Sequence, residues 1–227
     1  MRILVLAPHP DDDLIGCGGS LIKHEKAGAI ISIAYITSGE AGSKSLGTIR
    51  ESEAIKACAQ LGINANHLHF LHESDGGIVV GPKIVSEVVE IIRKGKPDII
   101  YLPHKYDNHP DHLATHQIGV KAIEQAGMSS WNSVDQPWSA GTVLAYEVWT
   151  PLRSPQYLED TTSVIEQLTQ ALSFHVSQLE IIAYDDMVRS LGRYRGLLLG
   201  NGHYAEAFEV LSINPSSLSL AENDSSK

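Results

Sequence analysis

Short, continuous apolar runs alternate with amphipathic segments along most of this chain, and this alternation limits the folds that are open to it. Residues 2–7 (RILVLA) and 29–37 (AIISIAYIT) are almost entirely apolar, as expected of strands that are buried on both faces. The segments between such runs carry apolar residues at helical spacing. The pattern predicts strands at 2–7, 29–37, 67–71, 97–103, 142–149 and 207–211, and helices at 13–27, 48–61, 82–94, 112–125 and through most of 161–191.

Repeated strand–helix–strand units with buried strands predict an α/β fold. We expect a single Rossmann-like, doubly wound domain over residues 1–213, with a mostly parallel sheet and helices on both faces. A flexible tail rich in Ser, Asn and Asp is expected over 214–227. A strand order of 3-2-1-4-5 would make the first and fourth strands neighbours where the order reverses. Ligands of open α/β sheets bind at that point, outside the carboxyl ends of the strands.

Composition argues against several classes of protein. The chain of 227 residues has 27 acidic and 17 basic residues, a formal net charge of -10. This balance argues against nucleic-acid binding, which needs a basic face, and against docking on an anionic membrane. No stretch approaches the roughly 20 apolar residues of a membrane span. Cys17 and Cys58 are too few for a disulfide framework and are expected to be free thiols, so the sequence predicts a cytoplasmic protein.

The first strand leads directly into PHPDDD at residues 8–13, where the first helix is expected to begin. A nucleotide-binding protein would have a glycine-rich fingerprint at this place to hold a pyrophosphate. Here Gly16, Gly18 and Gly19 come later, inside the expected helix, and the strand end carries one imidazole and three carboxylates. These groups repel a phosphate and attract a cation.

A second cluster, DNHPDH at residues 107–112, follows the fourth strand after a short loop. An aspartate run before a helix is often only an N-cap, and an isolated HPDH is often a polar loop. The two clusters converge, however, if the first and fourth strands are neighbours. Two His/Asp clusters in one crevice indicate a divalent metal site, and this mixture suits zinc, which in catalytic sites takes three protein ligands and keeps one open position.

Spacing within the two clusters suggests a role for each side chain. The expected ligands of a single zinc ion are His9, Asp12 and His112. Zinc lowers the pKa of its bound water to about 7, and Asp11 would remain beside the metal as the general base for that water. His109, held as an imidazolium by Asp111, would stabilise an oxyanion or protonate a leaving amine.

These motifs resemble those of the LmbE-like (PIG-L) N-acetylglucosaminyl deacetylases, a family that carries HPDDE after its first strand and HPDH after its fourth. Further matching segments are TSGE at 37–40, TIRESE at 48–53, HVSQ at 175–178 and YAEAF at 204–208. The last two are most similar to the bacillithiol-pathway branch. The resemblance runs from residue 1 to the YAEAF segment. Asp13 is a departure, because family members usually have Glu there.

The resemblance implies a zinc-dependent hydrolase that removes the acetyl group from an N-acetylglucosamine unit of a small-molecule substrate. It implies the same metal ligands, general base and oxyanion-stabilising pair as the spacing does. It adds Arg50 as a residue that lines the substrate pocket, with Asn108 and Tyr204 as weaker candidates. Packing in the core is an equal alternative for Tyr204. The other interpretation of Arg50 is a surface residue paired with Glu53 or Glu40.

Within this family, the bacillithiol-like motifs favour N-acetylglucosaminyl-malate as the substrate. Relatives often form homo-oligomers, so a homo-oligomer is one expected state. Two other functions fit an Asp/His site: a metal-dependent phosphoesterase, and a metal- or sugar-binding protein without turnover. An aspartate such as Asp11, which is not needed as a ligand, argues against the second. The loop at residues 127–140 contains Trp131 and Trp138, which would either flank a sugar or pack.

Overall fold

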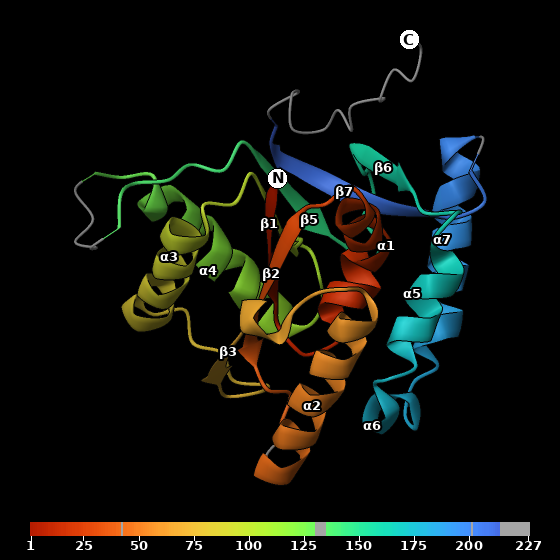
Figure 1. The fold of residues 1–227 in the computed structure, drawn as a ribbon, viewed down its shortest axis with the longest axis horizontal. Helices are drawn as coiled ribbons and strands as arrows, with labels where there is room; N and C mark the ends of the chain where they lie inside the picture. Colours follow the sequence, from red (N-terminus) through yellow and green to blue (C-terminus); the bar gives the residue numbers. More distant parts are fainter. Residues whose placement is uncertain (42, 130–134, 201, 214–227) are drawn as a thin grey trace.

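The computed structural model describes residues 1–41, 43–129, 135–200 and 202–213. Within them, seven strands form one sheet with the order β3-β2-β1-β4-β5-β7-β6 (Figure 1). The strands are β1 (Arg2–Ala7), β2 (Ile30–Thr37), β3 (Leu68–Glu73), β4 (Ile99–Pro103), β5 (Thr142–Tyr146), β6 (Tyr157–Asp160) and β7 (Ala205–Ser212). The first five pair in parallel, whereas β7 runs antiparallel to both β5 and β6. The expected order 3-2-1-4-5 is confirmed.

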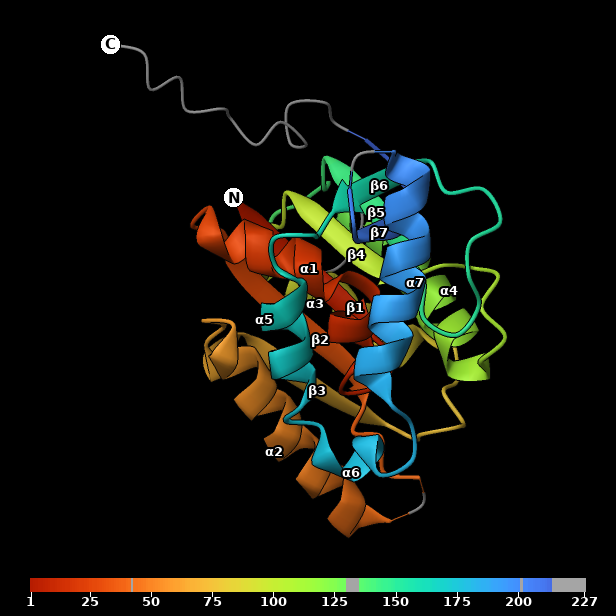
Figure 2. The ribbon, with the colours of Figure 1, turned by 90° about the vertical axis from the view of Figure 1, so that its right-hand side faces the viewer.

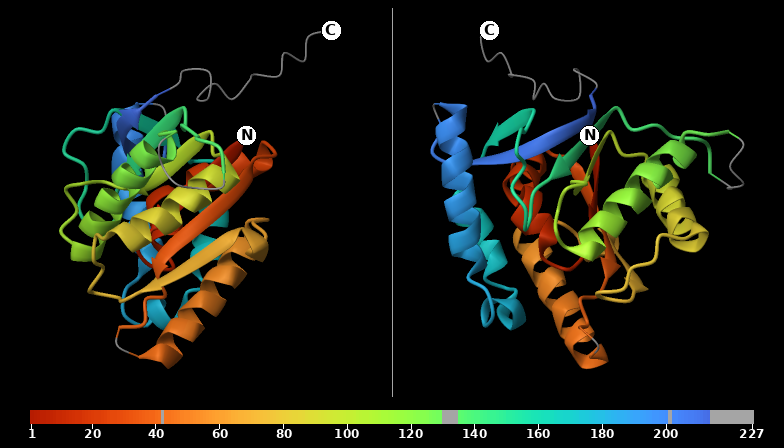
Figure 3. Two further views of the ribbon diagram at one scale, coloured as in Figure 1. Left: turned by 90° about the vertical axis from the view of Figure 1, so that its left-hand side faces the viewer. Right: turned by 180° about the vertical axis from the view of Figure 1, so that it is seen from behind.

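Helices cover both faces of this sheet, as predicted for a doubly wound fold (Figures 2 and 3). The helices are α1 (Asp12–Lys26), α2 (Lys44–Gln60), α3 (Pro82–Gly95), α4 (Pro110–Ala126), α5 (Ile165–Leu172), α6 (Val176–Leu179) and α7 (Tyr184–Leu199), with a 3-10 turn at Ala65–His67. Alternate residues of β1 enter two separate cores. Ile3, Val5 and Ala7 pack in the core formed with α1, α2, α5 and α7, while Leu4 and Leu6 pack in the core formed with α3 and α4.

The C-terminal third differs from the sequence prediction. The helix expected through most of 161–191 is three helices, because the backbone leaves the helical region at His175 and at Ala183. The pattern does not predict β6, whose pairing partner β7 lies far along the chain. The tail expected at 214–227 lies outside the described residues. Among the residues that the structure describes, no helix is long and apolar enough to cross a membrane.

The parallel pairing of β1 with β4 brings two loops together. Because both strands run in the same direction, residues 8–11 and 104–109 leave the sheet at the same edge, and α1 and α4 begin just beyond them. Both polar clusters therefore lie at the carboxyl edge of the sheet, where the strand order reverses.

Helix α1 is interrupted in its first half. Cys17 has φ −148° and ψ 16°, which divides α1 into a short first segment, residues 12–16, and a longer second segment, residues 18–26. At the break the backbone approaches β5 closely: a Cβ atom on Gly16 would lie 2.2 Å from Cδ2 of Tyr146. Glycine at this position is therefore required by packing.

Gly16→Ala is expected to destabilise the fold, because the Tyr146 ring cannot move easily: its hydroxyl donates to the Leu6 carbonyl oxygen at 2.9 Å. Overpacking of this kind costs about 1–3 kcal/mol, which urea unfolding would measure. Gly95→Ala in α3 is the matched control, since a Cβ there meets nothing within 4 Å, and it should leave the unfolding free energy unchanged or raise it by up to about 1 kcal/mol. Equal unfolding free energies for wild type and Gly16→Ala would contradict the packing argument.

Candidate active site

Three side chains from the two loops meet in a buried cluster. The Oδ2 atom of Asp12, in the first turn of α1, lies 3.0 Å from His9 Nδ1 and 3.3 Å from His112 Nε2. One donor atom from each of the three residues lies within 4.8 Å of the other two. All three side chains are buried. The structure therefore brings together the three residues that the sequence predicts as metal ligands.

The other ring nitrogen of each imidazole faces a further carboxylate. His9 Nε2 lies 3.1 Å from Asp111 and 3.0 Å from Asp75. His112 Nδ1 lies 3.5 Å from Asp107. Carboxylates in this position fix the orientation and tautomer of an imidazole that binds a metal. Sequence analysis gave no role to Asp75 or Asp107. Their position in the sequence could have identified them as site residues, because both lie just beyond strands at the same edge of the sheet.

The surrounding carboxylates determine the charge of both imidazoles. Burial disfavours the imidazolium form of His112, but the neighbouring carboxylates of Asp12 and Asp107 outweigh burial and raise its pKa to about 9. Hydrogen bonds to carboxylates likewise overcome the effect of burial on His9 and raise its pKa well above the ordinary value. Burial would raise the pKa of Asp12, yet its two imidazole neighbours lower it. The protonated imidazoles thus supply the positive charge that a divalent cation would supply at this position.

The donor set suits a zinc ion. Two imidazoles and one carboxylate around one point match the protein ligands of catalytic zinc sites. His112 is fully buried, and among the described residues neither of its ring nitrogens has a hydrogen-bond partner of good geometry. Since buried polar atoms are normally satisfied, these nitrogens indicate a missing partner such as a metal ion.

Asp11, the predicted general base, lies between the first loop and α1. Its φ of 155° is uncommon for a residue with a side chain, which indicates that the surrounding structure holds it in place. The carboxylate accepts hydrogen bonds from Arg50 Nη2 (3.0 Å) and from the Tyr184 hydroxyl. Burial raises its pKa to about 6, although the positive charge of Arg50 opposes this. Asp11 is therefore ionised at neutral pH, and two donors fix its orientation.

Arg50 is a buried residue of α2, and the interpretation that it is a surface residue paired with Glu53 or Glu40 is wrong. Besides Asp11, its guanidinium contacts the Gly39 carbonyl oxygen, to which Nη1 donates at 3.1 Å. Glu53 instead accepts hydrogen bonds from Ser177 of α6.

His109 is the N-cap of α4. Its Nδ1 accepts a hydrogen bond from the Asp111 backbone N–H at 3.3 Å, and its ring centroid lies 5.0 Å from that of His9 and 4.9 Å from that of His112. Burial and the positive charges of these two imidazoles lower its pKa. His109 is therefore neutral, with its proton on Nε2. Its Nδ1 accepts a hydrogen bond, which the imidazolium suggested by the spacing could not do, and its Nε2–H is a donor.

The carboxylate of Asp111 faces His9, whereas the sequence places it behind His109. It also accepts hydrogen bonds from the backbone N–H groups of Gly76 (2.6 Å) and Ile78 (3.3 Å). Asp111 thereby ties the loop after β3 to the cluster. It is linked to His109 by the backbone hydrogen bond of the N-cap, and one of its carboxylate oxygens lies within 4.8 Å of a ring nitrogen of His109.

The two weaker pocket candidates lie in different places. Asn108 is exposed beside the cluster, and its backbone N–H donates to Thr150 Oγ1 at 3.0 Å. Tyr204 lies where β7 meets α7: its backbone N–H donates to Thr162 Oγ1 at 3.0 Å, and its side chain hydrogen-bonds with Arg189. Asn108 is thus at the rim of the site, while the contacts of Tyr204 are those of a packing residue.

His175 is a residue at the site that sequence reasoning missed. It is 1% exposed, and among the described residues neither of its ring nitrogens has a hydrogen-bond partner. Burial and the nearby charge of Arg50 lower its pKa to about 4, so the ring is neutral. The HVSQ segment, which contains His175, could have indicated it, but in the sequence analysis this segment served only to identify a branch of the family.

Two other residues singled out in the sequence are buried or packed away from solvent. Asp13, which replaces the family Glu, accepts a hydrogen bond from the Tyr35 hydroxyl at 3.1 Å, and burial raises its pKa to about 7. Trp138 packs against the core formed with α3 and α4, and its Nε1 donates to the Pro97 carbonyl oxygen at 2.8 Å. Trp131 lies outside the described residues.

Comparison with known proteins identifies the family. The sequence model of the PIG-L family, described as GlcNAc-PI de-N-acetylase, matches residues 4–123, more than half of the chain and including both clusters. This chain belongs to the PIG-L family. The resemblance noted in the sequence is thereby confirmed.

Two relatives in sequence are named as deacetylases, enzymes that hydrolyse amide bonds. The chain is 28% identical over 230 residues to diacetylchitobiose deacetylase of Thermococcus kodakarensis, covering 92% of this chain and 83% of the relative. It is 28% identical over 228 residues to 1D-myo-inositol 2-acetamido-2-deoxy-alpha-D-glucopyranoside deacetylase of Thermomonospora curvata, covering 84% and 73%. Its fold matches the conserved protein TT1542 of Thermus thermophilus with a TM-score of 0.84 and 30% identity over 94% of each chain.

The protonated cluster makes the metal-free protein sensitive to pH. Because folding raises the pKa of His112 from 6.5 to about 9, its contribution to stability is fully present below pH 6.5 and is lost as the pH rises through 9. We expect chelator-treated protein to lose on the order of 1–3 kcal/mol of unfolding free energy over this range, measured by urea unfolding. Calorimetric zinc titration near neutral pH, in buffers of different ionisation enthalpy, should detect proton release. Binding without proton release would contradict the assigned charge state.

Proposed function

We propose that this chain is a zinc-dependent N-deacetylase that removes the acetyl group from an N-acetylglucosamine-type substrate. The observation that carries the proposal is a three-residue donor set with a separate carboxylate, Asp11, held beside it by Arg50. A protein that only binds metal or sugar has no need of a carboxylate held in this way. The activities named for the two relatives, on diacetylchitobiose and on a GlcNAc-inositol compound, support the same reaction.

The residues that would hold one zinc ion per chain are His9, Asp12 and His112. A bound divalent ion supplies Lewis acidity, which lowers the pKa of a water molecule and polarises a carbonyl oxygen. Asp111 and Asp75 orient the first imidazole through its Nε2 atom, and Asp107 orients the second through its Nδ1 atom.

Asp11 accepts the proton of the attacking water. With a pKa of about 6, its carboxylate is ionised at neutral pH and is still basic enough to take a proton. The water oxygen bonds to the amide carbon while the carbonyl electron pair moves to the carbonyl oxygen. When the tetrahedral intermediate collapses, the C–N bond breaks and the proton on Asp11 passes to the nitrogen. The products are acetate and the free amino sugar.

His109 stabilises the negative charge that develops on the former carbonyl oxygen. Since its Nδ1 accepts the backbone N–H of Asp111, its Nε2–H is available to donate to this oxygen. The backbone hydrogen bond also fixes the ring orientation before the substrate arrives, so the donor needs no rearrangement during the reaction.

For the substrate we propose a small N-acetylated amino sugar, with N-acetylglucosaminyl-malate as the first candidate because of the HVSQ and YAEAF segments. Arg50 and Asn108 are the proposed substrate contacts, one at the buried side of the site and one at its rim. Diacetylchitobiose and a GlcNAc-inositol compound are the other two candidates, from the named relatives.

Asp11→Asn is expected to keep zinc and to lower the rate of deacetylation by about 100- to 10,000-fold, because the amide cannot accept the water proton. Free-amine release from the three candidate substrates and from N-acetylglucosamine measures the activity, and metal analysis measures the zinc content. Asp185→Asn is the matched control, since Asp185 is an exposed carboxylate of α7; it should leave both quantities unchanged.

The same assays separate the other functions. Hydrolysis of an aryl phosphate without any amine release would favour a phosphoesterase. Binding of zinc and sugar with no turnover of any substrate would favour a binding protein. Full deacetylase activity in Asp11→Asn would show that Asp11 is not the base.

His109→Asn is expected to lower kcat by about 100- to 1,000-fold with little change in KM, because the lost donor acts mainly on the transition state. Asparagine is chosen because it is a good N-cap, so α4 keeps an acceptor for the Asp111 N–H. Steady-state kinetics on the best substrate measures kcat and KM separately. A rise in KM at constant kcat would contradict the oxyanion role and indicate substrate binding instead.

A further inference from the structure

The second segment of α1 has its first N–H groups satisfied from outside the helix. In an uninterrupted helix these groups would bond to the preceding turn, which the break at Cys17 disrupts. The Gly19 N–H donates to Glu206 Oε1 at 2.6 Å, and the Ser20 N–H donates to Glu206 Oε2 at 2.9 Å. The Ser20 hydroxyl donates to the same Oε2 at 2.6 Å. Both oxygens of one carboxylate are thus used at a single helix start.

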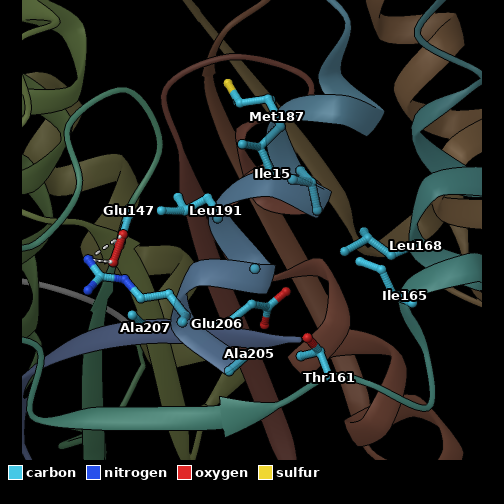
Figure 4. A pocket seen from close by; sticks show the side chains of 14 residues that line it. Ile15, Glu147, Thr161, Ile165, Leu168, Met187, Leu191, Ala205, Glu206 and Ala207 are labelled. Carbon is cyan, nitrogen blue, oxygen red and sulfur yellow. Dashed lines mark hydrogen bonds and ion pairs between the residues drawn. The ribbon is translucent and has the colours of Figure 1, made fainter. Parts of the chain in front are cut away.

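Glu206 reaches this point from β7. Its side chain projects into the crevice between α1, α5 and α7 (Figure 4). The cation of the crevice, Arg195, is paired with Glu147 at 2.6 Å, so it does not neutralise Glu206. Burial raises the pKa of Glu206 to about 7, while the Gly19 and Ser20 donors and the positive end of the second segment favour its carboxylate form. Glu206 is therefore an N-cap that a distant strand supplies.

The backbone around the break is packed without free space. A Cβ atom on Gly19 would lie 2.5 Å from Thr161 Cγ2 and 2.9 Å from Glu206 Oε1. On the other side of Cys17, Gly16 lies against the Tyr146 ring. The first segment of α1 is held between these contacts and the loop that carries His9, so its direction depends on how the break is held.

The first segment carries the residues of the site. Asp12 lies at its start, and the backbone N–H groups of Leu14 and Ile15 both donate to the Asp11 carbonyl oxygen at 3.0 Å. A change in the direction of this segment would move the carboxylates of Asp11 and Asp12 together relative to the imidazole of His112, which comes from another helix.

We propose that Glu206 is a positioning residue: by capping the second segment of α1 it holds the break at Cys17 and fixes the direction in which the first segment presents Asp12 to the two imidazoles. The inference rests on the proposed function, because it takes Asp12 to be a metal ligand. The competing explanation is that Glu206 stabilises the fold and leaves the geometry of the site unaffected.

Three variants separate these explanations. Glu206→Gln keeps the size of the side chain, but its NH2 group must face one of the donors that the carboxylate now accepts. Ser20→Ala removes the hydroxyl hydrogen bond and keeps both backbone bonds. Glu159→Gln is the matched control, since it neutralises a carboxylate of the neighbouring strand β6 that pairs with Lys23 of the same helix.

The variants and the wild type are titrated with Co²⁺ and followed by visible absorption, which reports the ligand geometry. Glu206→Gln should bind Co²⁺ about tenfold more weakly than the wild type and with an altered spectrum. Ser20→Ala should show a smaller loss, and Glu159→Gln none. In metal-free protein, hydrogen exchange at Leu14 and Ile15 should be faster in Glu206→Gln and unchanged in Glu159→Gln.

Wild-type Co²⁺ affinity, spectrum and exchange in Glu206→Gln would overturn the proposal, even if its melting temperature fell. If Glu206→Gln fails to fold, Ser20→Ala decides: unchanged affinity and unchanged exchange in that variant overturn the proposal. If the wild type binds no Co²⁺, the proposed function fails, while the exchange rates at Leu14 and Ile15 still decide whether Glu206 positions the first segment.

Discussion

The parallel contact between β1 and β4 is the constraint on which the rest of the site depends. His9 and Asp111 are 102 residues apart in sequence, yet their side chains lie 3.1 Å apart because the two strands end at one edge of the sheet. Each strand contributes a polar loop and the start of a helix. Burial of β1 on both faces fixes its register against β4, so hydrophobic packing at a distance sets the geometry of the polar cluster.

Three consecutive aspartates follow β1, and their surroundings give them three different properties. Asp12 lies between two imidazoles, which hold its pKa below the ordinary value. Asp11 is buried against Arg50 and has a pKa of about 6, whereas Asp13 is buried with only a tyrosine hydroxyl and has a pKa of about 7. The residue type is the same in each case, so burial and neighbouring charges give the proposed metal ligand, the proposed base and the buried Asp13 different acidities.

Sequence alone predicted the doubly wound parallel sheet, and it predicted the convergence of the two clusters for a strand order of 3-2-1-4-5, because buried parallel strands and polar strand ends leave strong local patterns. It failed where a property depends on contacts between distant segments. Nothing near His109 indicates that the carboxylate of Asp111 faces His9, and nothing near Arg50 indicates that its partner is Asp11. Strand β6 was not predicted for the same reason, since it is defined by its pairing with β7. For Tyr204 the sequence left a pocket role and core packing open, because a tyrosine beside a motif looks the same in both cases.

The course of α1 explains why this chain has the architecture of a nucleotide-binding fold without its phosphate site. In such folds the pyrophosphate lies at the N-terminus of the first helix, where backbone N–H groups and the helix dipole attract an anion. Here the protein supplies its own anions at that place, with Asp12 and Asp13 in the first turn. The break at Cys17 creates a second helix start inside the same element, and Glu206 occupies it. Gly16 and Gly19 lie farther along the helix, where they allow Tyr146 and Thr161 to approach the helix backbone. Carboxylates of the chain therefore lie at both helix starts, which leaves the carboxyl edge of the sheet suited to a cation.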